Sequence, residues 1–325
     1  MSAVVGLVEH AGGQPDRLSL EMLAFATRLG GVLRVPVHAV LVGEGAAAAA
    51  ETLGGFGVSA AHVVEHPRLD AYAPVAWAAG LGEVAAAVEA IGVLAPGSER
   101  GTEVLAHLAA RSGLPMAANV TEVTPGERWR ITRQRWAGSL LEEAWLDGAP
   151  RLMTVAAHAV APDEPAAGAG APPIVPLTPT LADADLRVRV TGRVESAGDR
   201  VSLTDARVVV GGGRGIGSAE GFAMLEELAG LLGGAVGVSR VVTSAGWRPH
   251  SEQIGQTGAR IAPDLYIACG ISGAIQHIVG CKSARRILVI NKDPAAPILG
   301  RAAYAVIGDV HTVVPAISAE IRRTR

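Results

Sequence analysis

The chain runs Gln253-Ile254-Gly255-Gln256-Thr257-Gly258 and then Gly270-Ile271-Ser272-Gly273-Ala274-Ile275-Gln276-His277 through its second half. Both stretches combine glycine with side-chain amides or hydroxyls, and the second stretch ends in a histidine. Glycine lets the main chain approach a ligand closely, and free backbone N–H groups bind phosphate well. The two stretches therefore predict loops that bind a phosphorylated ligand rich in hydrogen-bonding groups.

Five short apolar runs around these loops predict a doubly wound parallel sheet, because helix-like segments separate them. The expected strands are Val208–Gly211, Val236–Ser239, Leu265–Cys269, Ile287–Asn291 and Tyr304–Ile307. The expected helices are Ala219–Leu232, Gly273–Gly280 and a C-terminal helix near Val313–Arg323.

The first part of the chain also predicts an α/β domain. Residues 1–115 alternate short apolar runs with helix-like segments, beginning with a strand at Val4–Val8. This rhythm is typical of a parallel sheet covered by helices. Residues 116–160 change to pairs of strands, with turns at Pro125-Gly126 and Asp147-Gly148.

A proline-rich segment follows the strand pairs. Residues 161–179 contain six prolines, and a segment of this kind suits a semi-rigid connection over the surface. The expected organisation is an N-terminal domain over residues 1–160, a Pro/Ala-rich linker over residues 161–185 and a C-terminal domain over residues 186–325. An edge strand at Leu186–Val194 is expected to lead into the C-terminal domain.

The composition argues against several functional classes. A formal net charge of -3 gives no electrostatic case for binding nucleic acid or an anionic membrane. The basic and aromatic stretch Arg128–Trp136 is therefore interpreted as a surface strand. No apolar run approaches the roughly 18 residues of a membrane span, and no signal-peptide pattern is present. Cys269 and Cys281 lack a metal-ligand pattern, so we expect reduced core thiols and a cytoplasmic protein.

A strand, a glycine turn and a helix start follow one another over Val208–Ser218. This arrangement suits a phosphate at a helix N-terminus, with the Arg214 guanidinium as a bidentate partner. Neither a Walker lysine nor the GxGxxG spacing is present, so a tight structural turn stays open as the alternative.

Polar residues also follow the other predicted strands. Ser239 and Arg240 come at the carboxyl end of a strand, where open α/β sheets bind ligands; a solvated arginine is the alternative. Asn291 ends a strand and Asp309 follows the next, where an acid can bind ribose or simply belong to a loop. The sequence has no GxSxG or HExxH pattern and no paired Cys/His ligands, so it predicts neither catalytic residues nor a metal site.

Four blocks occur in order: Gly212–Gly215, Gln253–Gly258, Gly270–His277 and Asn291–Pro294. Together they resemble the electron-transfer flavoprotein alpha subunit. The resemblance implies two Rossmann-like domains, an N-terminal nucleotide-hydrolase-like sheet and a C-terminal domain that binds FAD. It also implies a heterodimer with a beta subunit. Such a complex carries electrons from flavin dehydrogenases, including the acyl-CoA dehydrogenases of fatty acid β-oxidation, to a quinone oxidoreductase, and performs no substrate chemistry of its own. The alternative is an NAD-linked enzyme on a Rossmann-like fold.

The resemblance assigns residues to each part of FAD. Arg214 and Ser272–Ala274 are expected at the phosphates, Ser239 and Arg240 beside the flavin, and Ile254–Thr257 at the ribityl chain and N5. His277 is expected at the flavin C2=O, and Asn291 and Asp309 at the adenosine. The full expected set is Arg214, Ser239, Arg240, Gln253, Ile254, Gly255, Gln256, Thr257, Ser272, Gly273, Ala274, Ile275, Gln276, His277, Asn291, Asp309 and Val310.

One departure from the family pattern lies close to these loops. Thr243-Ser244 stands where the family usually has Val-Asp. This difference bears on redox tuning and partner choice more than on FAD binding.

Overall fold

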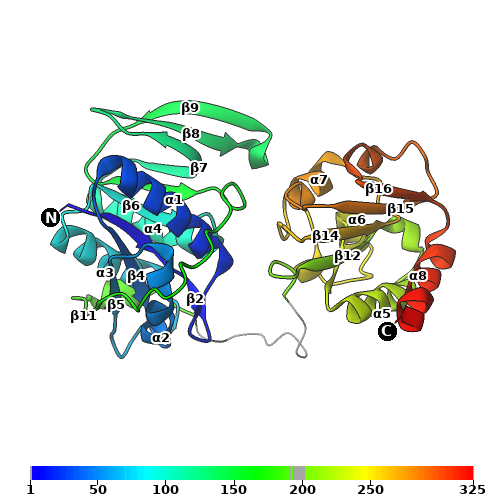
Figure 1. Ribbon diagram of the computed structural model, residues 1–325, viewed down its shortest axis with the longest axis horizontal. Coiled ribbons are helices and arrows are strands. Elements are labelled where there is room, and N and C mark those ends of the chain that lie inside the picture. Colours follow the sequence, from blue (N-terminus) through cyan, green and yellow to red (C-terminus); the bar gives the residue numbers. More distant parts are fainter. Residues whose placement is uncertain (1, 70, 191, 193–201, 325) are drawn as a thin grey trace. The chain divides into compact units, whose positions relative to one another are not determined.

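The computed structural model describes residues 2–69, 71–190, 192 and 202–324 of the chain (Figure 1). The chain divides into two compact units, Met1–Val194 and Glu195–Arg325. Each unit is built around a sheet of its own, with helices packed against it. The predicted α/β class with two Rossmann-like domains is confirmed. Among the helices of the described ranges, none combines the length and apolar composition needed to cross a bilayer.

The first unit contains a nine-stranded sheet in the order β11-β5-β4-β1-β6-β10-β7-β8-β9. Strands β7, β8 and β9 pair antiparallel and the remaining neighbours pair parallel, which matches the strand pairs expected after residue 115. A short hairpin joins β2 (His10–Ala11) and β3 (Gln14–Pro15). The strands of the sheet are β1 (Val4–Leu7), β4 (Val37–Val42), β5 (Ala60–Val64), β6 (Gly92–Pro96), β7 (Met116–Thr124), β8 (Trp129–Arg135), β9 (Leu140–Leu146), β10 (Arg151–Val155) and β11 (Ile174–Leu177).

Helices cover both faces of this sheet because its central strands are apolar on both sides. Every residue of β1 and β6 is buried, as expected for parallel strands between two helical layers. One core contains Met22 and Leu23 of α1, and the other contains Trp77 of α3 and Leu105 of α4. The helices are α1 (Arg17–Leu33), α2 (Ala46–Glu51), α3 (Pro74–Ala87) and α4 (Glu99–Ser112).

Part of the segment predicted as a linker belongs to the sheet of the first unit. Residues 174–177 form β11, the edge strand beside β5. The Ala61 N–H donates to the Pro173 carbonyl and the Glu65 N–H donates to the Leu177 carbonyl. Proline is tolerated here because an edge strand needs hydrogen bonds on one side only. The expectation of a plain surface connection over residues 161–185 is therefore corrected for this stretch.

The second unit contains a five-stranded, wholly parallel sheet in the order β13-β12-β14-β15-β16. Its strands are β12 (Val208–Gly212), β13 (Ala235–Val238), β14 (Leu265–Cys269), β15 (Ile287–Asn291) and β16 (Tyr304–Ile307). Its helices are α5 (Ala223–Leu232), α6 (Arg240–Ser244), α7 (Ile275–Cys281) and α8 (Val310–Thr324). The edge strand expected at 186–194 does not form over residues 186–190, and residues 191, 193 and 194 lie outside the described residues.

Both sheets have a topological switch point, where the chain changes the side on which it adds strands. In the first unit this point lies between β1 and β6, and in the second between β12 and β14. Ligands of open α/β sheets bind beyond the carboxyl ends of the strands at such points.

Candidate cofactor site

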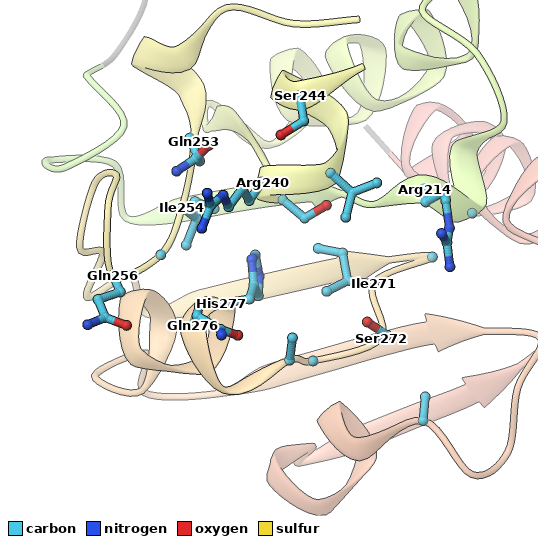
Figure 2. A pocket seen from close by; sticks show the side chains of 18 of the residues that line it. Arg214, Arg240, Ser244, Gln253, Ile254, Gln256, Ile271, Ser272, Gln276 and His277 are labelled. Atoms are coloured by element: carbon cyan, nitrogen blue, oxygen red, sulfur yellow. The ribbon is translucent and has the colours of Figure 1, made fainter. Parts of the chain in front are cut away.

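A cavity of about 630 Å³ lies at the carboxyl ends of β12, β13, β14 and β15 (Figure 2). This volume suits a small-molecule ligand or a large part of a dinucleotide. The cavity brings together most of the residues expected from the sequence. They are Arg214, Ser239, Arg240, Gln253, Ile254, Gly255, Gln256, Thr257, Ser272, Gly273, Ala274, Gln276, His277 and Asn291.

Three expected site residues, Ile275, Asp309 and Val310, lie outside the lining of this cavity. The Ile275 side chain is exposed, at the first position of α7. Asp309 forms an ion pair with Lys292 at 2.8 Å, and its Oδ1 accepts the His311 N–H at 3.0 Å. Val310 is a core residue.

The glycines after β12 and β14 let two loops pack directly on each other. The Gly213 N–H donates to the Cys269 carbonyl at 2.9 Å, and the Gly215 N–H donates to the Gly270 carbonyl at 3.1 Å. A Cβ atom on Gly213 would lie 2.2 Å from the Gly270 carbonyl oxygen, which is too close for any side chain to be tolerated without moving the backbone. Gly213 is therefore required for loop packing, whereas Arg214, the next residue, lines the cavity.

Two arginines supply positive charge to the cavity. Arg214 belongs to a short 3-10 turn after β12, and Arg240 is the first residue of α6. Figure 2 shows Arg214 on the side of Ser272 and Arg240 beside Ile254. No described residue forms a hydrogen bond or ion pair with either guanidinium. Unpaired guanidinium groups at a cavity favour a ligand with negative charge in more than one place.

His277 provides a buried donor at the same cavity. Its side chain is 6% exposed, and Nε2 lies 2.8 Å from the Tyr266 hydroxyl. Burial lowers the pKa of His277 to about 4, against a smaller opposing effect of the Ile254 backbone, so the ring is neutral near pH 7. Burial raises the pKa of Tyr266 well above its usual value, so its hydroxyl keeps its proton.

The tautomer of His277 follows from these partners. Nδ1 of His277 is buried and no described residue meets hydrogen-bond geometry with it, although the nearby Ile254 backbone favours the protonated ring. If the Tyr266 hydroxyl donates to Nε2, only the Nδ1–H lacks a partner; in the reverse arrangement both the tyrosine hydrogen and Nδ1 lack one. The first arrangement is favoured because unsatisfied buried polar groups cost free energy. It leaves the Nδ1–H as a donor on a ring that lines the cavity, and Figure 2 shows this ring between Arg240 and Ile271.

The loop after β14 is held in place before its helix begins. The Asn291 amide nitrogen donates to the Ile271 carbonyl at 2.8 Å, and its oxygen accepts the Asp293 N–H at 3.1 Å. The sequence predicts a helix from Gly273, but α7 begins at Ile275, because Gly273 has a left-handed φ of 83°. Ser272 and Gly273 are therefore loop residues, which corrects the expectation of a helix that begins at Gly273.

Sequence reasoning missed several residues of the site. Val241, Ser244, Ile271 and Asp293 line the cavity, and each lies within four residues of an expected site residue. Tyr266 was also missed, although a tyrosine in a buried strand signals a hydroxyl that needs a partner. Within the described ranges, no group of three or more His, Cys, Asp or Glu residues is placed to hold a metal ion.

Matches to known protein families and to related proteins cover both units of the chain. The family model of the electron transfer flavoprotein domain matches residues 4–182, and that of the electron transfer flavoprotein FAD-binding domain matches residues 202–282. The chain is 40% identical to the electron transfer flavoprotein subunit alpha of Mycobacterium tuberculosis over 99% of both chains. It is 32% identical to that of Thermoanaerobacterium thermosaccharolyticum, over 98% of this chain and 97% of the relative. It is 33% identical to protein FixB of Clostridium saccharobutylicum, over 97% and 94% of the two chains.

The residues at the cavity fit FAD. Two unpaired arginines suit its anionic groups, and the unpartnered Nδ1–H of His277 suits a flavin carbonyl. The cofactor of this chain is FAD, as the match to the FAD-binding domain shows. The chain belongs to the electron transfer flavoprotein alpha subunit family.

Proposed function

We propose that this chain is the FAD-binding subunit of a heterodimer that carries electrons from flavin dehydrogenases, such as acyl-CoA dehydrogenases, to a quinone oxidoreductase. Family membership supports the role of electron carrier. Within the site, one observation supports it: a cation, Arg240, and a buried neutral donor, His277, line one cavity. When bound, FAD supplies the redox chemistry that side chains lack.

Each part of the cavity has a proposed role in holding FAD. Arg214 and the loop amides of Ser272–Ala274 would hold the phosphates. Arg240, with Ser239 beside it, would stabilise negative charge on the reduced flavin, which raises the reduction potential. The His277 Nδ1–H would donate to the flavin C2=O. The further proposed contacts are Gln253, Ile254, Gly255, Gln256, Thr257, Ile275 and Gln276 near the flavin and ribityl chain, and Asn291, Asp309 and Val310 towards the adenosine.

The first unit would pair with the beta subunit. Large apolar side chains are exposed at the end of its antiparallel extension, where Trp136 is 78% exposed and Leu141 on β9 is 69% exposed. Leu140 and Trp145 of β9 are exposed beside them. Figure 1 shows β9 as the outer strand of this extension. Such a surface on a soluble protein commonly forms an interface, and a permanent complex buries more than about 2,000 Å² in total.

The proposed domain organisation keeps pairing and FAD binding apart. Residues 1–160 would form the pairing domain and residues 186–325 the FAD-binding domain, with 161–185 between them. We place the heterodimer in the cytoplasm. The buried free thiols of Cys269 and Cys281 support this placement, because a reducing compartment keeps cysteines unpaired.

Purification of the native heterodimer tests this function. The chain co-expressed with its beta subunit should give a yellow 1:1 complex, with one FAD identified by absorbance and mass. Expressed alone, the chain should aggregate or lose its flavin. A colourless complex, a bound NAD, or a stable monomer that holds FAD fully would contradict the proposal.

A further inference from the structure

Thr257 is the last of three hydrogen-bonded side chains, and the first of them, Thr243, lies outside the cofactor loops. The Thr257 hydroxyl oxygen accepts a hydrogen bond from the Gln253 amide nitrogen at 3.1 Å. The Gln253 side-chain oxygen in turn accepts from the Thr243 hydroxyl of α6 at 2.6 Å. Gln253 is only 2% exposed, so these two threonines, rather than water, fix its amide. The three side chains form a relay from α6 to the cavity.

In this arrangement the relay makes Thr257 a donor. A threonine hydroxyl has one hydrogen and two lone pairs. Because Thr257 uses a lone pair to accept from Gln253, its hydrogen stays available, and no described residue accepts it. Thr257 is exposed at the cavity, so this hydrogen can reach a ligand there.

The same three side chains can also run in the opposite direction. The Thr243 hydroxyl lies 2.9 Å from the Arg240 carbonyl, a second acceptor for its one hydrogen. When Thr243 donates to that carbonyl, a half-turn of the Gln253 amide lets its nitrogen donate to Thr243. The Gln253 oxygen then accepts from Thr257. Every member keeps a partner in both directions, so reversal leaves no buried polar group unsatisfied.

We propose that Thr243 and Gln253 are positioning residues that set, and can reverse, the hydrogen-bond direction of the Thr257 hydroxyl at the cavity. This inference rests on the proposed function, with the flavin N5 at Thr257 as the family resemblance implies. That ring nitrogen accepts a hydrogen bond in oxidised flavin and carries a hydrogen in fully reduced flavin. A reversible relay presents a donor to the first and an acceptor to the second, without moving the backbone.

The test uses Thr243→Val in the full chain, co-expressed with its beta subunit. Valine keeps the shape of threonine and replaces the hydroxyl with a methyl group. The variant should keep one FAD per complex, and the NMR resonances of the Gln253 side-chain amide should shift. The equilibrium constant for flavin reduction against a reference dye should change roughly threefold to tenfold, the scale of one hydrogen bond. Thr243→Ser, which restores the hydroxyl, should return both measurements to wild type.

Three outcomes would overturn the relay. Unchanged amide resonances together with an unchanged reduction equilibrium in Thr243→Val would show that Thr243 does not act on Thr257. Loss of FAD from Thr243→Val but not from Thr243→Ser would show that Thr243 holds the loop and does not set a direction. A colourless wild-type complex would overturn the proposed function itself, and is distinct from a yellow complex that is insensitive to Thr243→Val.

Discussion

At the switch point of the first unit, polar side chains of the loops after β1 and β6 bind each other, whereas in the second unit polar side chains of the equivalent loops line a cavity. In the first unit the Ser98 hydroxyl donates to the Glu9 carboxylate and accepts the Gly101 N–H at the start of α4. A carboxylate of the chain therefore lies at the helix N-terminus, where an anionic ligand would otherwise bind.

The second unit has the reverse arrangement at its switch point. Arg214 and Arg240 have no partner among the described residues, and the Nδ1 of His277 has none either. Both sheets have a topological switch point, so the presence of a switch point alone does not determine where a ligand binds. What differs is whether the loops at the switch point satisfy one another or leave donors and cations for a ligand.

The largest expected effect comes from forcing apart the two loops that pack on each other in the second unit. Gly213→Ala places a methyl group against the Gly270 backbone, and backbone cannot give way cheaply. We expect a loss of about 3 kcal/mol of unfolding free energy, at the upper end for overpacking, and loss of FAD. Thermal unfolding and the flavin-to-protein ratio measure both. Gly230→Ala is the control, because its Cβ would meet nothing within 4 Å, and it should be neutral or stabilising.

Removing the side-chain contact between the two loops at the first switch point should lower the unfolding free energy and leave FAD binding unchanged. Ser98→Ala removes the N-cap of α4 and the hydroxyl that donates to buried Glu9. The expected loss is about 2 kcal/mol of unfolding free energy, with the FAD content unchanged. Chemical denaturation of the complex measures the first and absorbance the second. If this variant lost FAD at full stability, the first unit would contribute to the cofactor site, and the two switch points would not have separate roles.

Removing one cation from the second switch point should leave stability unchanged and alter the reduction equilibrium of the bound flavin. Arg240→Ala should leave the fold and bound FAD intact, and should lower the equilibrium constant for flavin reduction roughly tenfold, because reduced flavin loses a charged hydrogen-bond partner. A redox titration against a reference dye measures this. Arg285→Ala removes an equal charge from an exposed position outside the cavity lining and should have a much smaller effect. An equal effect from both variants would mean that net charge, rather than position, sets the potential.

The smallest effect concerns the pH dependence of the first unit. Desolvation raises the pKa of Glu9, against the opposing hydrogen bond from Ser98. A carboxyl group whose pKa is raised by folding contributes stability below its unfolded pKa, and this contribution is lost as pH rises through the folded pKa. Relative to Glu9→Gln, the wild type should therefore lose unfolding free energy as pH rises from the ordinary glutamate pKa of 4.5 through the raised pKa of Glu9. If the unfolding free energies of the two proteins changed equally with pH over this range, burial would not raise the pKa of Glu9.

Much of the second unit could be predicted because its strands are short apolar runs with polar ends. β14, β15 and β16 begin and end at the expected residues, since each lies between loops that cannot continue a strand. The positions of Arg214 and Arg240 at the cavity also follow from pattern, because residues after parallel strands gather at one edge. The FAD assignment came from the order of four loop motifs, not from composition.

Other features depend on partners that are distant in sequence. Strand β11 contains Pro176 and forms only because β5 offers an open edge. At 186–190 the alternation of apolar and charged residues predicts a strand, but Leu186 enters the core and the Val190 N–H donates to the Tyr72 carbonyl instead. The sequence also did not predict the hydrogen bond between Tyr266 and His277, because the two residues lie on different elements, β14 and α7.

Strand β16 has a consequence for how a cell must make this protein. All four of its residues are exposed, Tyr304 and Ile307 by more than half, and it is the last strand of its sheet. A free apolar strand edge promotes aggregation of newly synthesised chains. We therefore expect the soluble yield of this chain to fall as its rate of synthesis rises, with the excess in inclusion bodies or degraded by proteases.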